Sequence, residues 1–355
     1  MHELIGAIHL HSVYSDGSGT VREMTAAAAR AGLDYLILTD HDTRRAAEDG
    51  WQGWRDGVLV VVGVEVTCRH RTHLVVLGEA DVRGLRFKPL RRALFDLSRQ
   101  GASALVAHAH PAHIMGISLK AGPLHEWEIP GFTGVELWSL MHDVCDGLTP
   151  WRIPSFPYTW RRRIRGPHPP TVAHWDRITQ DRRFVAIGSL DNHAVAVPVV
   201  GKRILPYEEL FRALRTHVLV DEAVVGETGD ADRLIRAIVA GRCFIALDET
   251  ADALGFRFEG RPEAGGEPLA MGEERTWTGP VRLAVRSPHP ARLLIRRHGR
   301  VVAEANGADA LDHRAEGPGV YRAEAHLAGR PWVYTNPIYL RGEEQAAAPL
   351  RTRGE

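Results

Sequence analysis

Short apolar runs alternate with helical patterns over about the first 250 residues. The runs are rich in β-branched residues and lack a simple apolar–polar alternation, which is typical of strands buried on both faces. The pattern predicts eight strands: Ile5–His11, Asp34–Thr39, Val58–Thr67, His73–Leu77, Ala102–His108, Gly134–Trp138, Phe184–Ser189 and Cys243–Leu247.

Helical segments lie between several of these runs. Thr20 and Glu23 have the spacing of a capping box, which predicts a helix through Ala31 with Gly32 just past its end. The pattern also predicts helices from Pro89 to Gln100, over Leu210–Thr216 and over Ala231–Ala240. Repeated strand–helix units imply an α/β fold with a parallel sheet, and eight strands suggest a barrel or distorted barrel.

Two stretches depart from this alternation. Residues 146–170 carry six prolines and several arginines, which predicts a lid, a binding loop or a disordered segment. Beyond residue 251 only strand patterns recur: Gly255–Glu259, Val281–Ser287, Ala291–Arg297, Arg300–Glu304, Gly319–His326 and Trp332–Tyr339. We therefore expect an α/β domain over 1–250, a small all-β sandwich over 251–341 and a disordered tail over 342–355.

Composition and charge narrow the function classes. The chain has 44 basic and 44 acidic residues, so the net charge is zero and a global basic surface for nucleic acid is not expected. The N-terminal residues do not resemble a secretory signal, and the longest apolar run, Val58 to Val64, is far too short to span a membrane. Three cysteines without a CxxC motif argue against a Cys-ligated zinc site. We expect a cytoplasmic protein without a membrane or stable nucleic-acid partner.

Histidine is the unusual component of the sequence. There are 19 histidines, and most of them lie at or before His193. Several stand as His–x–His or with carboxylates at the ends of predicted strands: His9 and His11 with Asp16, Asp40-His41-Asp42, Glu65, His73, His108 and His110, and Asp191-Asn-His193. In a barrel, the carboxyl ends of the strands meet at one mouth.

So many imidazoles and carboxylates at one mouth favour a multinuclear metal site, because His and carboxylate ligands suit zinc, iron and manganese. Each pair taken alone is more often ordinary surface or loop chemistry than a ligand pair. The prediction therefore depends on their occurrence together and in order. His113, His125, His142 and His174 have no such context and are interpreted as ordinary residues.

These motifs resemble the PHP superfamily, named for polymerase and histidinol phosphatase, over about residues 5–195. The resemblance implies a distorted (β/α)7-type barrel with two or three divalent metal ions. It implies one metal on His9, His11, Glu65 and Asp191, a second on Glu65, His73 and His108, and a third on Asp16, His41 and His193. Asp16 in the third group resembles the nucleotide phosphoesterase branch more than histidinol phosphatase.

One motif departs from the usual Ala-His-Pro of this family. Ala107-His108-Ala109-His110-Pro111 offers two registers. The distance from Gly101 favours His108 as the ligand, and the adjacent proline favours His110. We select His108 and keep His110 as a neighbouring ligand or substrate contact.

The expected activity is metal-dependent hydrolysis of small organic phosphate mono- or diesters, with nucleotides among the candidate substrates, by a hydroxide that bridges two metals. We expect Asp16, His41, Glu65 and His193 to be catalytic. Arginine forks suit phosphate, so the substrate contacts expected are Arg161, Arg163, Arg165, His168 and His110. No lysine ends a barrel strand, so Glu65 rather than a carboxylated lysine is the expected bridge.

Two other functions remain open from the sequence. Gly319–Glu324 and Trp332–Tyr339 resemble the C-terminal region of a branch that includes carbamate (carbaryl) hydrolases, and the same metal site could attack a carbamate or amide. The second alternative is a non-catalytic metal- or carbohydrate-binding protein in which the β domain does the binding.

Overall fold

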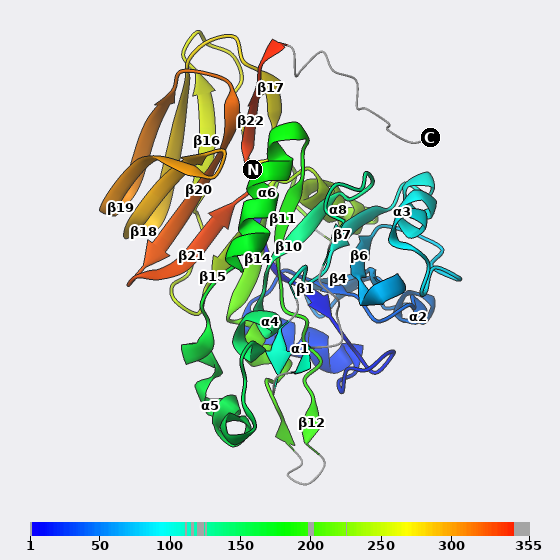
Figure 1. Cartoon of the computed structure of the whole chain (residues 1–355). Coiled ribbons are helices and arrows are strands. Elements are labelled where there is room, and N and C mark those ends of the chain that lie inside the picture. Colours follow the sequence, from blue (N-terminus) through cyan, green and yellow to red (C-terminus); the bar gives the residue numbers. More distant parts are fainter. Residues whose placement is uncertain are drawn as a thin grey trace.

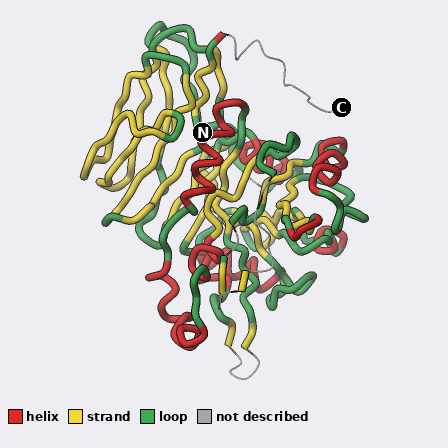
Figure 2. The backbone as a smooth tube through the Cα atoms, in the orientation of Figure 1, coloured by secondary structure: helices red, strands yellow, loops and turns green. Residues whose placement is uncertain are grey.

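The structure is a computed structural model, and it describes residues 2–110, 112–114, 117–118, 124, 126–197, 202–224 and 226–343. It is a mixed α/β protein (Figures 1 and 2). Strands without helices between them fill one end, and helices surround the strands elsewhere (Figure 2). No helix in this part of the chain is long and apolar enough to cross a membrane.

The apolar runs of the first 250 residues form two sheets. The first includes β1 (His2–Leu10), β2 (Tyr35–Leu38), β3 (Gly53–Arg55), β4 (Val58–Val62), β14 (Leu214–Val220) and β15 (Cys243–Leu247). The second contains β5 (Val64–Thr67), β6 (His73–Leu77), β7 (Ser103–Val106), β10 (Gly134–Ser139) and β11 (Val185–Ser189), in the order β11-β10-β7-β6-β5. Except for β3, these strands are buried along nearly their whole length, as expected for strands covered on both faces.

The predicted single run Val58–Thr67 is two strands in two different sheets. Gly63 separates them, and a Cβ on Gly63 would lie 2.6 Å from the carbonyl oxygen of Val76. The chain therefore passes from the first sheet into the second without a loop. The two sheets also meet at β1, where the amide of Leu190 donates to the carbonyl of Ile8 (3.0 Å) and that of His11 donates to the carbonyl of Asn192 (3.1 Å).

The described helices are α1 (Val21–Ala31), α2 (Arg45–Glu48), α3 (Leu90–Arg99), α4 (Leu140–Cys145), α5 (Phe156–Thr159), α6 (Pro169–Asp181), α7 (Tyr207–Phe211) and α8 (Asp230–Val239), with 3-10 turns η1 (Arg69–Arg71), η2 (Pro150–Ser155) and η3 (Trp160–Arg163). The predicted capping box is confirmed: Thr20 Oγ1 accepts from the amide of Glu23, and Glu23 accepts from the amide of Thr20. Gly32 ends α1 with a φ of 73°, a conformation that favours glycine.

The helix predicted over Leu210–Thr216 is wrong. Helix α7 ends at Phe211, and the chain continues as strand β14. β14 pairs antiparallel with β1 on one side and with β15 on the other. Its side chains are almost all buried there, so pairing between two existing strands overrides the local helical pattern.

The proline-rich stretch consists of short helical turns rather than a disordered segment. Pro150 begins η2, and Pro169 occupies the first turn of α6, where a missing N–H costs nothing. The ring of Trp160 is fully buried and anchors the stretch against the rest of the molecule. Figure 1 shows α5 at the lower end of the molecule and α6 across its middle.

The remaining strands are β16 (Arg257–Pro262), β17 (Glu274–Thr276), β18 (Val281–Arg297), β19 (Arg300–Ala315), β20 (Gly319–Leu327), β21 (Arg330–Thr335) and β22 (Ile338–Arg341), and two short hairpins pair β8 (His113–Ile114) with β9 (Ile117–Ser118) and β12 (Ala196–Val197) with β13 (Lys202–Arg203). The two strands predicted within 281–297 are one long strand with a register irregularity between Arg286 and Ala291.

The C-terminal strands continue the first sheet, because β21 pairs antiparallel with β15. The resulting strand order is β16-β18-β20-β21-β15-β14-β1-β2-β4-β3. The ladders of the described residues give open sheets rather than a closed barrel. Most of the expected tail, residues 344–355, lies outside the described residues.

Candidate metal centre

Strand direction brings the predicted ligands to one place. β1, β2 and β4 are parallel, as are β7, β10 and β11, so their carboxyl ends share an edge. His73 stands at the start of its strand, but β6 runs antiparallel to β5 and β7. The first residue of β6 therefore lies beside the last residues of its neighbours.

The carboxylate of Glu65 is the centre of the cluster. Its Oε2 lies 3.0 Å from His9 Nε2, 3.2 Å from His11 Nε2 and 3.2 Å from His41 Nδ1. Its Oε1 lies 2.7 Å from His73 Nδ1 and 3.0 Å from His108 Nε2. Five imidazoles thus converge on a single buried carboxylate.

Two further carboxylates complete the cluster. Asp191 Oδ1 lies 3.5 Å from His9 Nε2 and 3.4 Å from His11 Nε2. On the solvent side, Asp16 Oδ1 lies 3.2 Å from His193 Nε2, and Asp16 Oδ2 lies 3.6 Å from His41 Nε2. The structure thus gathers all nine residues predicted as metal ligands.

Their donor atoms form groups compact enough for a shared ion. His9, His11, Glu65 and Asp191 form one such group, and Asp16, His41 and His193 form another together with His11. The second predicted group, Glu65, His73 and His108, differs in one member. In the structure, His41 groups with Glu65 and His73, whereas His108 groups with His142 and Asp191. His108 nevertheless contacts Glu65 and lies 3.3 Å from His73 Nδ1.

The backbone is strained at three of these residues. His9, His108 and Asp191 have φ angles of 68°, 26° and 51°. Positive φ is uncommon for residues other than glycine and clusters at functional sites, where surrounding structure holds it in place. At His9 the pairing of β1 with β2 also shifts register, so the two imidazoles of the His–x–His pair do not simply follow a regular strand.

The charges of the cluster are tightly coupled. Burial raises the pKa of Glu65, but the neighbouring histidines, His9 foremost, outweigh it and hold the pKa well below its usual range. Burial likewise opposes ionisation of Asp16, yet His193 lowers the pKa of that carboxyl to about 2. For His11, contacts with Asp191 and Glu65 outweigh burial and raise the pKa to about 9. Glu65 and Asp16 therefore stay ionised, and their negative charge favours cations beside them.

Buried atoms without hydrogen-bond partners show that the donor set fits metal ions. They include His9 Nε2, His11 Nδ1 and Nε2, His41 Nδ1 and Glu65 Oε2. A buried polar atom that makes no hydrogen bond is costly, at roughly 1–3 kcal/mol each. Imidazole nitrogens and carboxylate oxygens that face one another without hydrogen bonds are the donors that zinc, iron or manganese accept.

The sequence did not single out two residues of the centre. Glu136 is buried on β10; its Oε1 lies 2.5 Å from His9 Nδ1, and its Oε2 accepts from the amide of His108 (2.8 Å). His142, interpreted as ordinary, has its Nδ1 3.4 Å from Asp191 Oδ2 and stacks on His108 with ring centroids 4.4 Å apart. A carboxylate inside the apolar run Gly134–Trp138 was an available signal for Glu136. His142 had none, because α4 was not predicted.

The residues predicted to contact substrate divide into two groups. His110, Arg165 and His168 line a cavity of about 740 Å³ next to the cluster. Arg161 instead pairs with Glu249 and Glu209, and Arg163 donates to the carbonyls of Val144 and Asp146. The described structure does not bring these two arginines to the cluster or its cavity.

His110 lies outside the cluster. Its Nδ1 lies 2.6 Å from Thr171 Oγ1, and its ring stacks on that of His168 with centroids 4.0 Å apart. Of the two registers left open by the sequence, it is thus His108 that the fold places beside Glu65.

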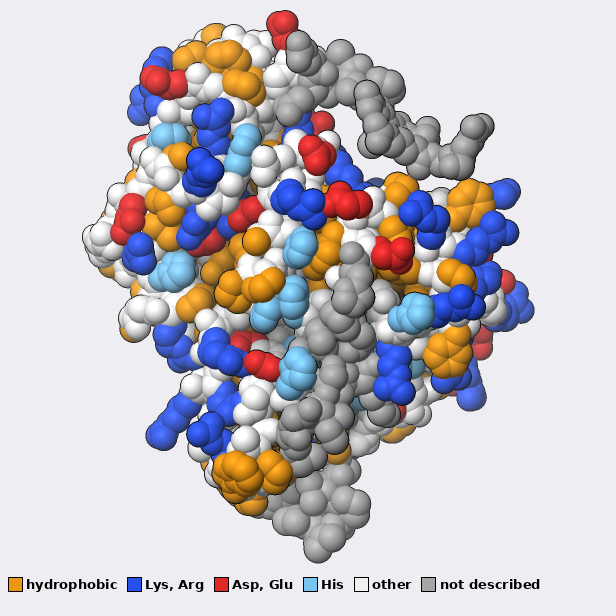
Figure 3. All heavy atoms as spheres, viewed as in Figure 1, with side chains coloured by type: hydrophobic (Ala, Val, Ile, Leu, Met, Phe, Trp, Pro, Cys, Tyr) orange, Lys and Arg blue, Asp and Glu red, His pale blue; other side chains and the backbone are white. Residues whose placement is uncertain are grey.

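Histidine side chains also gather on the surface over α6 and α4 (Figure 3).

Comparison with known proteins gives a consistent result. Residues 7–129 match the family model of the PHP domain. A phosphoribosyl 1,2-cyclic phosphate 1,2-diphosphodiesterase of Eggerthella lenta is 36% identical over 81 residues, which cover 21% of this chain and 31% of that protein. A 3',5'-nucleoside bisphosphate phosphatase of Chromobacterium violaceum is 37% identical over 109 residues, which cover 28% of this chain and 38% of that protein. The matches thus span about a third of each relative.

A solved structure also matches nearly the whole chain. It is a two-domain protein of Bacteroides vulgatus described as containing a predicted PHP-like metal-dependent phosphoesterase. The match covers 95% of both chains at 15% identity, with a TM-score of 0.43.

Proposed function

The chain contains a PHP domain, the domain of the polymerase and histidinol phosphatase superfamily, and on that premise we propose that it is a metal-dependent phosphoesterase. Its substrates are small organic phosphate mono- or diesters. The observation that carries the proposal is the convergence of five imidazoles on Glu65, with Asp191 and Asp16 next to the same histidines.

His9, His11, Glu65 and Asp191 would hold one ion, Glu65, His73 and His108 a second, and Asp16, His41 and His193 a third. When bound, such ions neutralise phosphoryl oxygens and make water a better nucleophile near neutral pH. In the reaction, a water oxygen bonds to phosphorus, the ester P–O bond breaks, and the leaving oxygen takes one proton from that water.

The chain's own residues supply position and charge. Glu65, Asp16, His41 and His193 remain the proposed catalytic group, because they span the cluster from its buried centre to its solvent side. Asp16 is half exposed and His193 is 24% exposed, whereas Glu65 is fully buried. A substrate therefore reaches the centre from the side of Asp16 and His193 or through the cavity beside His108.

We also propose the distorted (β/α)7-type barrel, with β4 and β5 counted as one continuous strand beside β1, β2, β6, β7, β10 and β11. The direct passage through Gly63 and the hydrogen bonds between β1 and the end of β11 support it. Domain limits of 1–250 and 251–341, with a β-sandwich in the second part, belong to the same proposal.

The test uses the whole chain loaded separately with Mn²⁺, Fe²⁺ or Zn²⁺ and assayed with p-nitrophenyl phosphate, bis-p-nitrophenyl phosphate and an aryl carbamate. We expect phosphate-ester turnover that a chelator abolishes and added metal restores. Glu65→Gln and Asp191→Asn should lower both bound metal, measured by elemental analysis, and turnover. Glu128→Gln is the matched control, because Glu128 is exposed and pairs with Arg177. Turnover of the carbamate alone would refute the proposal.

A further inference from the structure

A cavity of about 740 Å³ opens directly beside the metal centre. Its lining includes His108, Glu136 and His142, which belong to or contact the cluster. His142 connects the two spaces, because it stacks on His108 and faces Asp191. A group bonded to a phosphate at the cluster can therefore extend into this cavity.

Much of the cavity wall is apolar and contains flat rings. Ala109, Ala112, Leu137, Trp138, Pro167 and Pro169 provide the apolar part. The stacked imidazoles of His110 and His168 provide a polar edge together with the hydroxyl of Thr171. Apolar walls with a few placed polar groups are typical of sites for small organic ligands.

The fixed charges of the wall do not favour a second anion. Arg165 is the one arginine or lysine among the described lining residues. Its guanidinium donates to Asp146 Oδ2 (3.0 Å) and approaches Asp143 Oδ1 (3.6 Å), and both carboxylates also line the cavity. With Glu136 included, three carboxylates and one arginine that is already paired line the cavity.

From this arrangement we propose that the cavity binds the leaving group of the ester, and that this group is partly apolar and carries no negative charge, such as a phenol or a nucleoside. This inference rests on the proposed phosphoesterase function and narrows its substrate class. A substrate with a second phosphate on the leaving group would place that phosphate against Asp143 and Asp146. The chain thus differs in preference from a phosphatase for bisphosphates.

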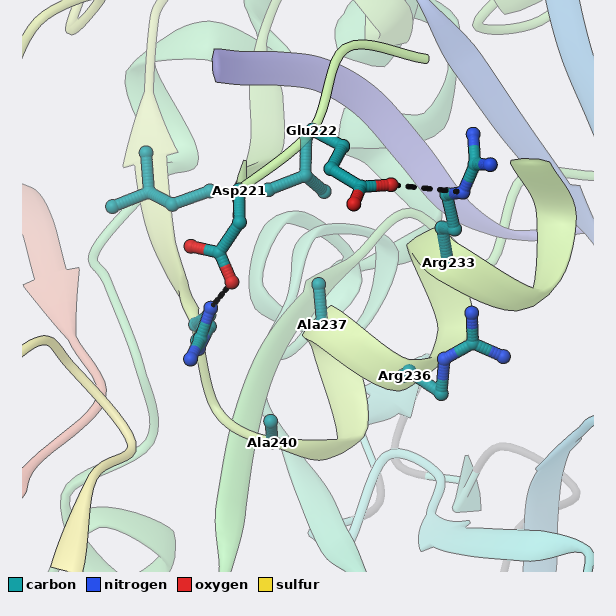
Figure 4. Close-up of a pocket in the computed structure, with 9 residues that line it drawn as sticks. Asp221, Glu222, Arg233, Arg236, Ala237 and Ala240 are labelled. Atoms are coloured by element: carbon teal, nitrogen blue, oxygen red, sulfur yellow. Dashed lines mark hydrogen bonds and ion pairs between the residues drawn. The ribbon is translucent and has the colours of Figure 1, made fainter. Parts of the chain in front are cut away.

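A second pocket provides a control position far from the centre. It lies at the carboxyl end of β14 and against α8, where Asp221 pairs with Arg242 and Glu222 with Arg233 (Figure 4). Val220 is paired with His2 at the start of β1, whereas the cluster begins at His9. Seven residues of strand correspond to about 20 Å, so a charge removed here does not act on a substrate at the cluster.

The experiment measures kcat/KM of the metal-loaded chain for three aryl phosphates that differ in the charge of a remote substituent. They are the neutral 4-(carbamoylmethyl)phenyl phosphate, the anionic 4-(carboxymethyl)phenyl phosphate and the cationic 4-(aminomethyl)phenyl phosphate, whose methylene groups keep the leaving phenols similar. We expect the neutral and cationic esters to exceed the anionic ester about tenfold, since like charges a few ångströms apart repel in a partly buried site.

The variant Asp146→Asn tests the cause of this preference. Asparagine keeps the Oδ1 acceptor for the amide of His113 (3.0 Å) but removes one negative charge from the wall. The ratio of neutral to anionic ester should fall about fivefold, whereas Asp221→Asn should leave it unchanged.

Each outcome separates this inference from the function on which it rests. Equal or faster turnover of the anionic ester overturns the inference about the leaving group but leaves the proposed phosphoesterase function unaffected. If the ratio of kcat/KM for the neutral and anionic esters is unchanged in Asp146→Asn, the cavity is not the site that binds the leaving group. Absence of turnover with every phosphate ester refutes the proposed function itself.

Discussion

Glu136 shows how one residue can organise several ligands without being among those predicted. Its two carboxylate oxygens orient the ring of His9 and fix the backbone of His108, a residue with a positive φ. Carboxylates behind metal-binding histidines fix the tautomer and direction of the ring. Glu136 is therefore a positioning residue for two of the proposed ions.

Replacing Glu136 with glutamine should weaken metal binding about 10- to 100-fold. Glutamine keeps the shape but removes the charge that favours the ring of His9 with its proton on Nδ1. Affinity is measured by competition with a chromophoric chelator, with Glu128→Gln as the exposed control. If Glu136→Gln and Glu128→Gln both bind metal as tightly as the parent chain, the charge of Glu136 does not position the metal ligands.

At the scale of elements, a buried charge network joins strands remote from the centre. His217 on β14 is fully buried between Glu3 Oε1 on β1 (2.7 Å) and Asp248 Oδ2 beyond β15 (3.1 Å). Arg257 of β16 also contacts Glu3, so the network reaches into the C-terminal strands. Burial lowers the pKa of His217, but hydrogen bonds to Asp248 and Glu3 outweigh it and raise the pKa.

This shift predicts a dependence of stability on pH. A histidine whose pKa is raised by folding stabilises the protein fully below its unfolded pKa, about 6.5, and loses that contribution as pH rises through the folded value. The free energy of unfolding should therefore fall above about pH 6.5 through this residue. Urea denaturation from pH 5 to 9 measures it as the difference between the parent chain and His217→Gln.

The comparison needs an exposed histidine as its control. His289→Gln should retain the parent pH profile, because His289 is exposed on β18. A difference between parent and His217→Gln that stays constant over the whole pH range would show that His217 contributes packing and not a proton.

At the scale of the molecule, the C-terminal strands and the α/β part share both a ladder and a buried polar contact. Asn336, just after β21, donates to the carbonyls of Ala186 (2.8 Å) and Cys243 (2.9 Å) and accepts from the amide of Ala186 (2.8 Å). Arg322 of β20 forms an ion pair with Asp176 of α6 (2.7 Å). Figure 1 shows these strands beside α6. We therefore expect the two parts to unfold together.

Asn336→Ala should lower the free energy of unfolding by about 2–4 kcal/mol, because it removes three hydrogen bonds to buried backbone groups of β11 and β15. Denaturation of the whole chain measures the change. The control is Asn306→Ala at an exposed position, whose free energy of unfolding should stay within about 0.5 kcal/mol of the parent value. Two separated transitions in calorimetry of the parent chain would contradict a single cooperative unit.

The sequence by itself determined the elements whose signals are local. The capping box of α1, the buried apolar strands and the order of histidines and carboxylates at strand ends all follow from neighbouring residues. These signals were sufficient to predict an α/β fold, a PHP resemblance and the set of residues that the structure gathers around Glu65.

Only the tertiary structure decided what depends on distant segments. β14 is a strand because β1 and β15 flank it, and the C-terminal strands extend the first sheet because β21 reaches β15. The same applies to the arginines: Arg161 is bound by Glu209 and Glu249, whereas Arg165 faces the cavity with two carboxylates. Pairing partners and charge partners come from parts of the chain that no local pattern connects, so the fold alone selects among them.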